Sequence, residues 1–280
     1  MKECNYIQLK ERALELKREV IKMVGIGNAG HIGGSFSLAE ILAALYFHKL
    51  RHDPQNPDWE DRDRVVFSKG HAAVIQYAAL ALCGYFPKEE LGKLKQLGAR
   101  LQGHPDKLTT PGIEANTGSL GQGLSISCGM AAAAKVDKKD SKTYCIVGDG
   151  EQCEGQIWEA AMAAANFKLD NLVAIVDKNK LMATGPIVDR FDNNPVVDKW
   201  KAFGWHVIEI DGHDIEQVVK ALDDADEVKG KPTVIIAHTI KGKGVSFTEH
   251  NPAFHNGTLT EEQYHAALKE LATVEGADAI

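Results

Sequence analysis

The sequence has no apolar stretch long enough to cross a membrane. The longest mainly apolar run, residues 72–86, is interrupted by Gln76 and falls short of the roughly 18 residues that a spanning helix needs. The amino terminus also lacks the apolar segment of a secretory signal peptide. We therefore expect a cytoplasmic protein that does not cross a membrane.

Cysteine and positive charge are also scarce. The five cysteines are odd in number and include no Cys-x-x-Cys pair, so a disulfide framework and a structural zinc site are both unexpected. The chain has 32 Lys and Arg residues against 39 Asp and Glu residues, and its net charge of -7 leaves no excess positive charge to neutralise a polynucleotide. We expect no nucleic-acid partner, although small anions can still bind at local sites.

Strand and helix patterns alternate along most of the chain. Apolar residues recur at three- and four-residue steps between residues 9 and 24 and predict a helix. After a glycine-rich loop, the pattern Ser37-Leu38-Ala39-Glu40 is typical of a capping box and predicts a helix from residue 41. Helix-length segments separate short β-branched runs, so we expect a largely parallel sheet with ligands at the carboxyl ends of its strands. The predicted strands are 65–67, 144–147, 172–176, 206–210 and 233–237.

The most informative segment is Gly148-Asp149-Gly150-Glu151, which directly follows a predicted strand. The next strand is followed by Asn179, which lies 30 residues after Asp149. A β-α-β unit of that length brings both side chains to adjacent strand ends. One carboxylate, one amide oxygen and a nearby main-chain carbonyl form a hard-oxygen set that suits Mg²⁺ or Ca²⁺.

Two other interpretations of this segment need to be weighed. Asp-Gly pairs are common in plain turns, but the distance from Asp149 to Asn179 favours a site. Asp177 stands where a Rossmann fold places its ribose-binding acid. The glycine fingerprint of that fold is incomplete, because Cys153 replaces the third glycine and residues 118–123 have the spacing reversed. We therefore do not expect a nicotinamide site.

The histidines divide into two groups. A lone histidine is more often structural or exposed than catalytic, which is our interpretation of His48, His52, His206, His213 and His265, while His238 stays open. The second group sits in glycine-flanked loops, where side chains are free to face a ligand, and comprises His31, His71, His104 and His255. Neutral imidazoles can donate and accept protons near neutral pH.

Together these segments resemble the transketolase family of thiamine-diphosphate-dependent enzymes. Gly-Asp-Gly followed about 30 residues later by Asn is similar to the cofactor signature of that family. Ile32 and Ser119 stand where full-length transketolases usually carry proline, which puts only local loop stiffness in doubt. The resemblance covers residues from about 25 to 257 and continues, in order, through 30–34, 68–72, 103–106, 117–123, 241–244 and 254–257.

The resemblance implies one diphosphate-binding domain over residues 1–280. Its expected fold is a three-layer α/β fold, with a mostly parallel sheet and helices on both faces, and a short helical tail from about residue 258. The implied cofactors are thiamine diphosphate and Mg²⁺ or Ca²⁺, with Asp149, Asn179 and Leu181 as the metal ligands.

The resemblance also implies roles for individual residues. His31, His104 and His255 would bind sugar hydroxyl groups or relay protons. Glu154 and Glu159 would take part in a proton relay at a subunit contact, although Glu159 is equally well interpreted as an exposed helix residue. The implied cofactor contacts are His31, His71, Gly118, Ser119, Leu120, Gly148, Asp149, Gly150, Glu151, Asn179, Leu181 and His255.

A complete transketolase has a second α/β domain, and this sequence shows no second set of strands and helices. That domain supplies the glutamate that protonates the pyrimidine ring and most sugar-phosphate contacts. We therefore expect the amino-terminal subunit of a split transketolase, which transfers a two-carbon ketol unit from a ketose, expected to be phosphorylated, to an aldose. Its partner would be a pyrimidine-binding subunit in an α2β2 assembly. The alternatives are the α-component of a 2-oxo acid dehydrogenase, which His31 and His104 disfavour, and a non-catalytic cofactor-binding subunit.

Overall fold

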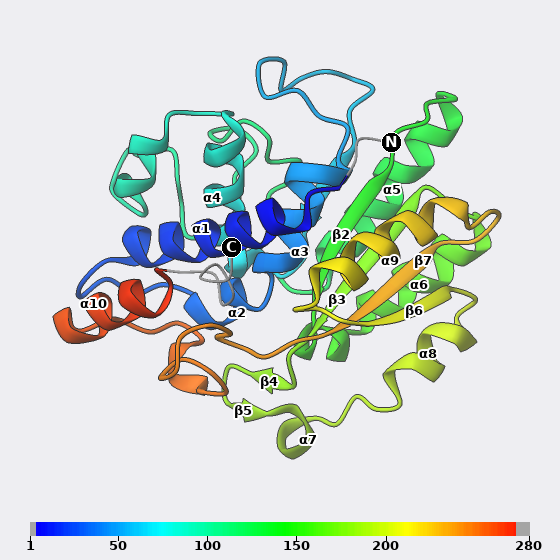
Figure 1. Ribbon diagram of the computed structural model, residues 1–280. Helices are drawn as coiled ribbons and strands as arrows, with labels where there is room; N and C mark the ends of the chain where they lie inside the picture. Colours follow the sequence, from blue (N-terminus) through cyan, green and yellow to red (C-terminus); the bar gives the residue numbers. More distant parts are fainter. Residues whose placement is uncertain (1–3, 273–280) are drawn as a thin grey trace.

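The computed structural model describes residues 4–272, and a five-stranded parallel sheet forms its centre (Figure 1). The strand order is β1-β2-β3-β7-β6, and all neighbouring strands run parallel. Each predicted strand is present, with ends that differ from the prediction by no more than two residues. The strands are β1 (Arg64–Phe67), β2 (Thr143–Gly148), β3 (Leu172–Lys178), β6 (His206–Asp211) and β7 (Thr233–His238).

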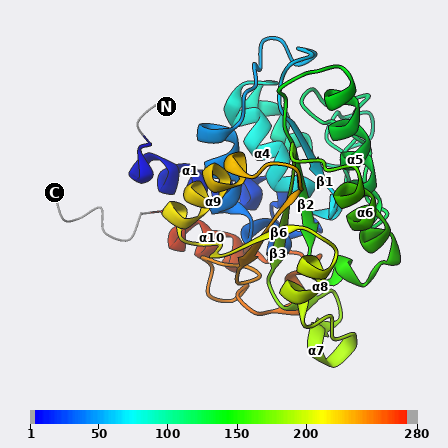
Figure 2. The same cartoon turned by 90° about the vertical axis from the view of Figure 1, so that its right-hand side faces the viewer.

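Helices cover both faces of the sheet, which confirms the three-layer α/β fold (Figure 2). One layer contains α1 (Tyr6–Val24), α2 (Ile32–Phe36), α3 (Ala39–Ala44), α4 (Ala73–Cys83) and α9 (Ile215–Glu227). The other contains α5 (Gln122–Val136), α6 (Gly155–Asn166) and α8 (Val196–Ala202). Within residues 4–272, no helix combines the length and the apolarity that a membrane span requires.

Short elements connect the layers. The hairpin of β4 (Leu181–Met182) and β5 (Gly185–Pro186) leads into α7 (Ile187–Arg190), and these elements lie together beyond one end of the sheet in Figure 1. A π-helical turn, η1 (Leu45–Lys49), follows α3. The remaining turns are 3₁₀ helices: η2 (Gly70–Ala72), η3 (Lys88–Lys93), η4 (Gly150–Cys153) and η5 (Pro252–Phe254).

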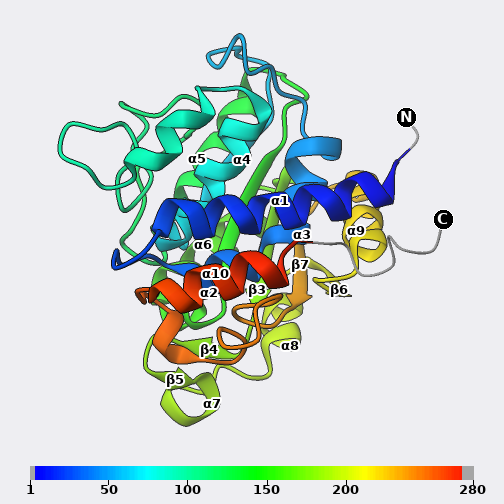
Figure 3. The same cartoon turned by 60° about the vertical axis from the view of Figure 1, so that its left-hand side comes forward.

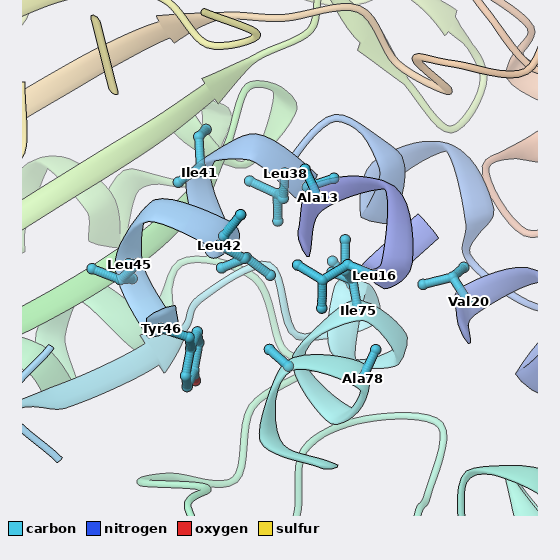
Figure 4. Close-up of a cluster of buried hydrophobic side chains, with 14 of the residues drawn as sticks. Ala13, Leu16, Val20, Leu38, Ile41, Leu42, Leu45, Tyr46, Ile75 and Ala78 are labelled. Atoms are coloured by element: carbon cyan, nitrogen blue, oxygen red, sulfur yellow. The ribbon is translucent and has the colours of Figure 1, made fainter. Parts of the chain in front are cut away.

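The strands are apolar throughout because their two faces enter different cores. In β2, Tyr144 and Ile146 face the core that contains α1, whereas Cys145 and Val147 face α5 and α6. A strand buried on both faces needs apolar residues at successive positions, so a continuous run marks it rather than alternation. Figure 4 shows part of the larger core, where residues from α1, α3, η1 and α4 meet. They include Ala13, Leu16, Val20, Leu38, Ile41, Leu42, Leu45, Tyr46, Ile75 and Ala78.

The start of α3 corrects the predicted capping box. The helix begins at Ala39 rather than residue 41, and no side chain caps it. The hydroxyl of Ser37 donates instead to Asp177 Oδ2 at 2.6 Å. Glu40 turns away to contact Lys17 and His213. A buried carboxylate needs donors from its surroundings, and this tertiary contact overrides the local pattern.

The carboxyl-terminal segment contains α10 (Glu261–Glu270), which lies alongside α1 in Figure 3. Ala267 and Leu271 are fully buried, and Arg18 donates to the Leu271 carbonyl at 2.7 Å. This segment therefore packs on the larger core, whereas the sequence predicted a solvated terminal element. Short helices with exposed charges can still bury one apolar stripe.

Gly123 and Gly129 provide a matched test of how α5 packs. A Cβ atom on Gly123 would lie 2.4 Å from Ser68 Cα, a backbone atom that cannot rotate away. We expect Gly123→Ala to lower the free energy of unfolding by about 1–3 kcal/mol, the usual cost of overpacking. A Cβ on Gly129 meets nothing within 4 Å, so Gly129→Ala should raise that free energy by up to about 1 kcal/mol. Urea unfolding measures both, and equal effects would contradict this packing.

Candidate functional site

A cavity of about 400 Å³ opens where β2 and β3 end. Most of the expected cofactor contacts line it, namely His71, Gly118, Leu120, Gly148, Asp149, Gly150, Glu151, Asn179, Leu181 and His255. Glu154 also lines the cavity. Four expected site residues lie outside its lining, namely His31, His104, Ser119 and Glu159.

The structure brings Asp149 and Asn179 together at adjacent strand ends, because β2 and β3 are neighbours. Asp149 is buried, and its Oδ2 accepts from the Lys180 N–H at 2.7 Å. Burial raises the pKa of its carboxyl. Asn179 Oδ1 accepts from the Leu181 N–H at 3.1 Å.

The donor set of this strand-end site fits a hard cation. The Asp149 carboxylate, the Asn179 amide oxygen and the Leu181 carbonyl each keep a free lone pair beside the cavity. Residues 4–272 contain no group of three His, Cys, Asp or Glu residues that could hold a metal ion. The predicted set is of another kind, since it has one carboxylate and two neutral oxygens.

Asp177 has an internal role that differs from that of a ribose ligand. It is fully buried, and its Oδ2 lies 2.5 Å from the Lys69 ammonium, while its Oδ1 accepts from the Thr239 hydroxyl at 2.5 Å. It also accepts from Ser37 and from the Asn179 amide. Burial alone would raise the pKa of Asp177, but Lys69 and the hydroxyl donors hold it below its usual range. The carboxylate is saturated from within, so the structure does not support a nicotinamide site.

Glu151 lies at the cavity wall, and its carboxylate is turned inward. Its Oε2 accepts from the Gly148 N–H at 2.8 Å, and its Oε1 accepts from the Gly121 N–H at 2.8 Å and the Ser68 hydroxyl at 2.5 Å. Burial raises the pKa of this carboxyl, and the three donors oppose the shift. One side chain therefore joins the segment after β1, the start of α5 and the end of β2.

Four histidines from separate loops form a cluster beside the cavity. The ring centroid of His31 lies 5.2 Å from that of His71, 5.4 Å from that of His255 and 6.3 Å from that of His104. The rings of His71 and His255 are 5.0 Å apart. His31 and His104 thus adjoin the cavity through the cluster, although neither lines it.

Glycines permit these loops to approach one another. Gly30 and Gly257 exchange two main-chain hydrogen bonds, at 3.0 and 3.1 Å, which hold the loop of His31 against the loop of His255. Gly118 has a φ of +148°, and a Cβ on it would lie 2.9 Å from the His104 ring. A side chain at either contact would push the histidines apart.

The imidazoles of the cluster are neutral. Burial lowers the pKa of His31 to about 3, that of His71 to about 2 and that of His255 to about 4. The ammonium groups of Lys69 and Lys241 add to the shifts of His71 and His255. Neutral imidazoles can both donate and accept hydrogen bonds, which suits contacts with hydroxyl groups.

Lys241 is a site residue that the sequence reasoning missed. Its buried ammonium contacts His255 Nδ1 at 2.9 Å and the Leu181 carbonyl at 3.0 Å. Burial lowers its pKa to about 8. It forms no salt bridge within the described part of the chain, so it offers positive charge to an anion in the cavity. Its position in Lys-Gly-Lys-Gly, directly after β7, was the available signal.

Further unpredicted residues also line the cavity, and two other histidines lie elsewhere. The additional lining residues are Gly34, Lys69, Cys153, Met182, Ala183 and Thr184. His213 has a structural role, because it contacts Glu40 at 3.0 Å and accepts from the Ile240 N–H at 2.8 Å. His238 contacts Glu209 at 3.1 Å on the edge strand and does not line the cavity.

The neutral histidines predict a dependence of stability on pH. In the unfolded chain they titrate near pH 6.5, so below about pH 6.5 the unfolded state binds protons that the folded state does not. The free energy of unfolding should therefore fall as pH is lowered from about 7 to about 4. Urea unfolding across this range checks it. His71→Gln should make the fall shallower and His265→Gln, on an exposed face of α10, should not; identical slopes in both variants would contradict a neutral His71.

Comparison with known proteins identifies the family. Residues 10–276 match the family model described as the thiamine diphosphate-binding domain of transketolase. A 6-deoxy-6-sulfo-D-fructose transketolase subunit from Clostridium sp. (strain MSTE9) is 48% identical, with 95% of this chain and 96% of the relative covered. One of the two subunits of an apulose-4-phosphate transketolase from Phocaeicola vulgatus is 44% identical, with 91% of each covered.

Solved structures show the same fold. The transketolase of Campylobacter jejuni superposes with a TM-score of 0.90 and 37% identity. The alignment covers 98% of this chain and 44% of that one. The chain thus spans less than half the length of that transketolase. It belongs to the transketolase family, in which it corresponds to the thiamine diphosphate-binding domain.

Proposed function

We propose that the chain is the amino-terminal subunit of a two-subunit transketolase. The observation that carries the proposal is the cavity at the ends of β2 and β3, which has oxygen ligands on one side and the four-histidine cluster on another. The reaction is the transfer of a two-carbon ketol unit from a ketose to an aldose. The names of two relatives contain a sulfonated and a phosphorylated sugar, which supports an anionic substrate such as a sugar phosphate.

Thiamine diphosphate, when bound, supplies the nucleophilic carbon for cleavage beside the ketose carbonyl. In our proposal Asp149, Asn179 and the Leu181 carbonyl hold Mg²⁺ or Ca²⁺ against its diphosphate. Lys241 and the cation would offset the phosphate charge, because Lys69 is already neutralised by Asp177. The other cofactor contacts would come from His71, His31, His255, Gly118, Ser119, Leu120, Gly148, Gly150 and Glu151.

The sugar would lie over the histidine cluster. His31, His104 and His255 are proposed to bind its hydroxyl groups and to move protons, because their imidazoles can donate and accept. Glu154 and Glu159 are exposed near the start of α6, where they are accessible to another chain. We assign them to a subunit contact with a proton relay.

The chain is proposed to work with a separate pyrimidine-binding subunit, in an assembly with two copies of each. This follows from the match to little more than two-fifths of a single-chain transketolase and from full-length matches to proteins named as subunits. The partner would supply the acidic residue for the pyrimidine ring and most of the sugar-phosphate contacts. The cytoplasmic location stays a prediction.

The chain alone should transfer no ketol unit, even when saturated with thiamine diphosphate and Mg²⁺. Without a partner, water reaches the pyrimidine side of the cofactor and no acid assists it. The measurement is transfer from several ketose phosphates to an aldose, with and without a pyrimidine-binding subunit. Robust turnover by the chain alone would contradict the two-subunit proposal, and no turnover with the partner would favour a non-catalytic cofactor-binding role.

Substitution of His104 should separate sugar binding from cofactor binding. His104 is exposed, borders His31 and lies outside the cavity lining. We expect His104→Ala to reduce kcat/KM about tenfold or more, because a lost hydrogen bond costs roughly 0.5–1.5 kcal/mol and more if it strengthens in the transition state. The dissociation constant of thiamine diphosphate should stay near the wild-type value. His265→Ala is the control, and loss of cofactor with normal turnover after resaturation would contradict the assignment.

A further inference from the structure

The carboxylate of Asp149 is held from two directions. Its Oδ2 accepts from the Lys180 N–H at 2.7 Å. Its Oδ1 faces two side-chain amides, that of Asn193 at 3.3 Å and that of Gln152 at 3.5 Å. Both amides also donate to the main-chain carbonyl of Asp149, Asn193 at 2.9 Å and Gln152 at 3.3 Å. The plane of the carboxylate is therefore set by groups behind it, while Asp149 lines the cavity in front.

Asn193 comes from a segment that is otherwise exposed. Residues 191, 192, 194 and 195, between α7 and α8, all lie at the surface, whereas Asn193 is 3% exposed. Its carbonyl accepts from Lys199 of α8 at 2.8 Å. One inward-facing side chain thus connects a surface segment to Asp149.

Gln152 is anchored from the same side of the molecule. Its Oε1 accepts from the indole N–H of Trp200, a fully buried residue of α8, at 2.9 Å. Both amides that reach Asp149 are therefore attached to α8, and neither occupies the cavity lining. An amide NH₂ only donates, so its two contacts leave the remaining lone pairs of the carboxylate for a ligand.

We propose that Asn193 is a positioning residue of the cation site, whose amide orients the Asp149 carboxylate toward the cavity and couples the 191–195 segment to cation binding. The inference rests on the proposed function, because it takes Asp149 as the cation ligand. Hydrogen bonds to a ligating carboxylate fix its orientation, and their loss typically weakens metal affinity about 10- to 100-fold. No other part of the site supplies this restraint to Oδ1 except Gln152, at a longer distance, among the residues described.

The test is the dissociation constant of Mg²⁺, measured by titration calorimetry on the full chain with saturating thiamine diphosphate. Asn193→Ala removes the donor, and Asn193→Leu removes it while keeping most of the side-chain volume. Both should weaken Mg²⁺ binding about tenfold or more. Asn194→Ala is the matched control, because the Asn194 side chain is exposed and donates to Asp192 rather than to Asp149. Its Mg²⁺ affinity should stay at the wild-type value.

The outcomes separate this inference from the proposed function. Urea unfolding of each variant shows whether it is folded, and a purely structural Asn193 would lower stability while leaving the Mg²⁺ affinity of the folded chain unchanged. That result, or equal affinities for Asn193→Leu and Asn194→Ala, overturns the inference. Asp149→Ala should abolish Mg²⁺ binding. Unchanged binding in Asp149→Ala, or no binding by the wild type, overturns the cation assignment of the proposed function and the inference with it.

Discussion

The buried ion pair of Lys69 and Asp177 is the interaction on which the site depends. Lys69 follows β1 and Asp177 belongs to β3, so the pair spans β2, which lies between them, and Asp177 also holds Thr239 beyond β7. Both side chains are almost fully removed from water, and loss of one partner of such a pair typically costs about 3–5 kcal/mol. Because Asp177 also accepts from the Asn179 amide, the ends of three strands and a cavity residue share one electrostatic centre.

Charge in the site is divided between lysines and neutral imidazoles. Lys69 is satisfied internally, whereas Lys241 contacts only carbonyl oxygens and His255 and keeps a charge for the cavity. The same charges, together with burial, keep the clustered histidines unprotonated. A site of this kind can hold an anion such as a diphosphate at one end. At the other end it presents groups that exchange hydrogen bonds with neutral hydroxyls.

The sequence predicted the layers and the strand ends but not the internal contacts of the polar residues. Continuous apolar runs identified all five strands because strands covered on both faces have few alternatives. The spacing from Asp149 to Asn179 predicted their meeting because a β-α-β unit has nearly constant geometry. The Ser37 pattern failed, and Lys241 and Asn193 were missed, because their partners lie far away in the chain.

By itself, then, the sequence determined the parallel α/β sheet, the edge at which ligands bind and, through its motifs, the family. These properties follow from local periodicity and from spacing within single β-α-β units. Only the tertiary structure decided how the carboxylates divide their tasks: Asp177 is saturated inside, Glu151 ties three segments together, and Asp149 remains at the cavity. The physical reason is that a buried carboxylate is defined by the donors around it, and these donors come from segments that only folding brings together.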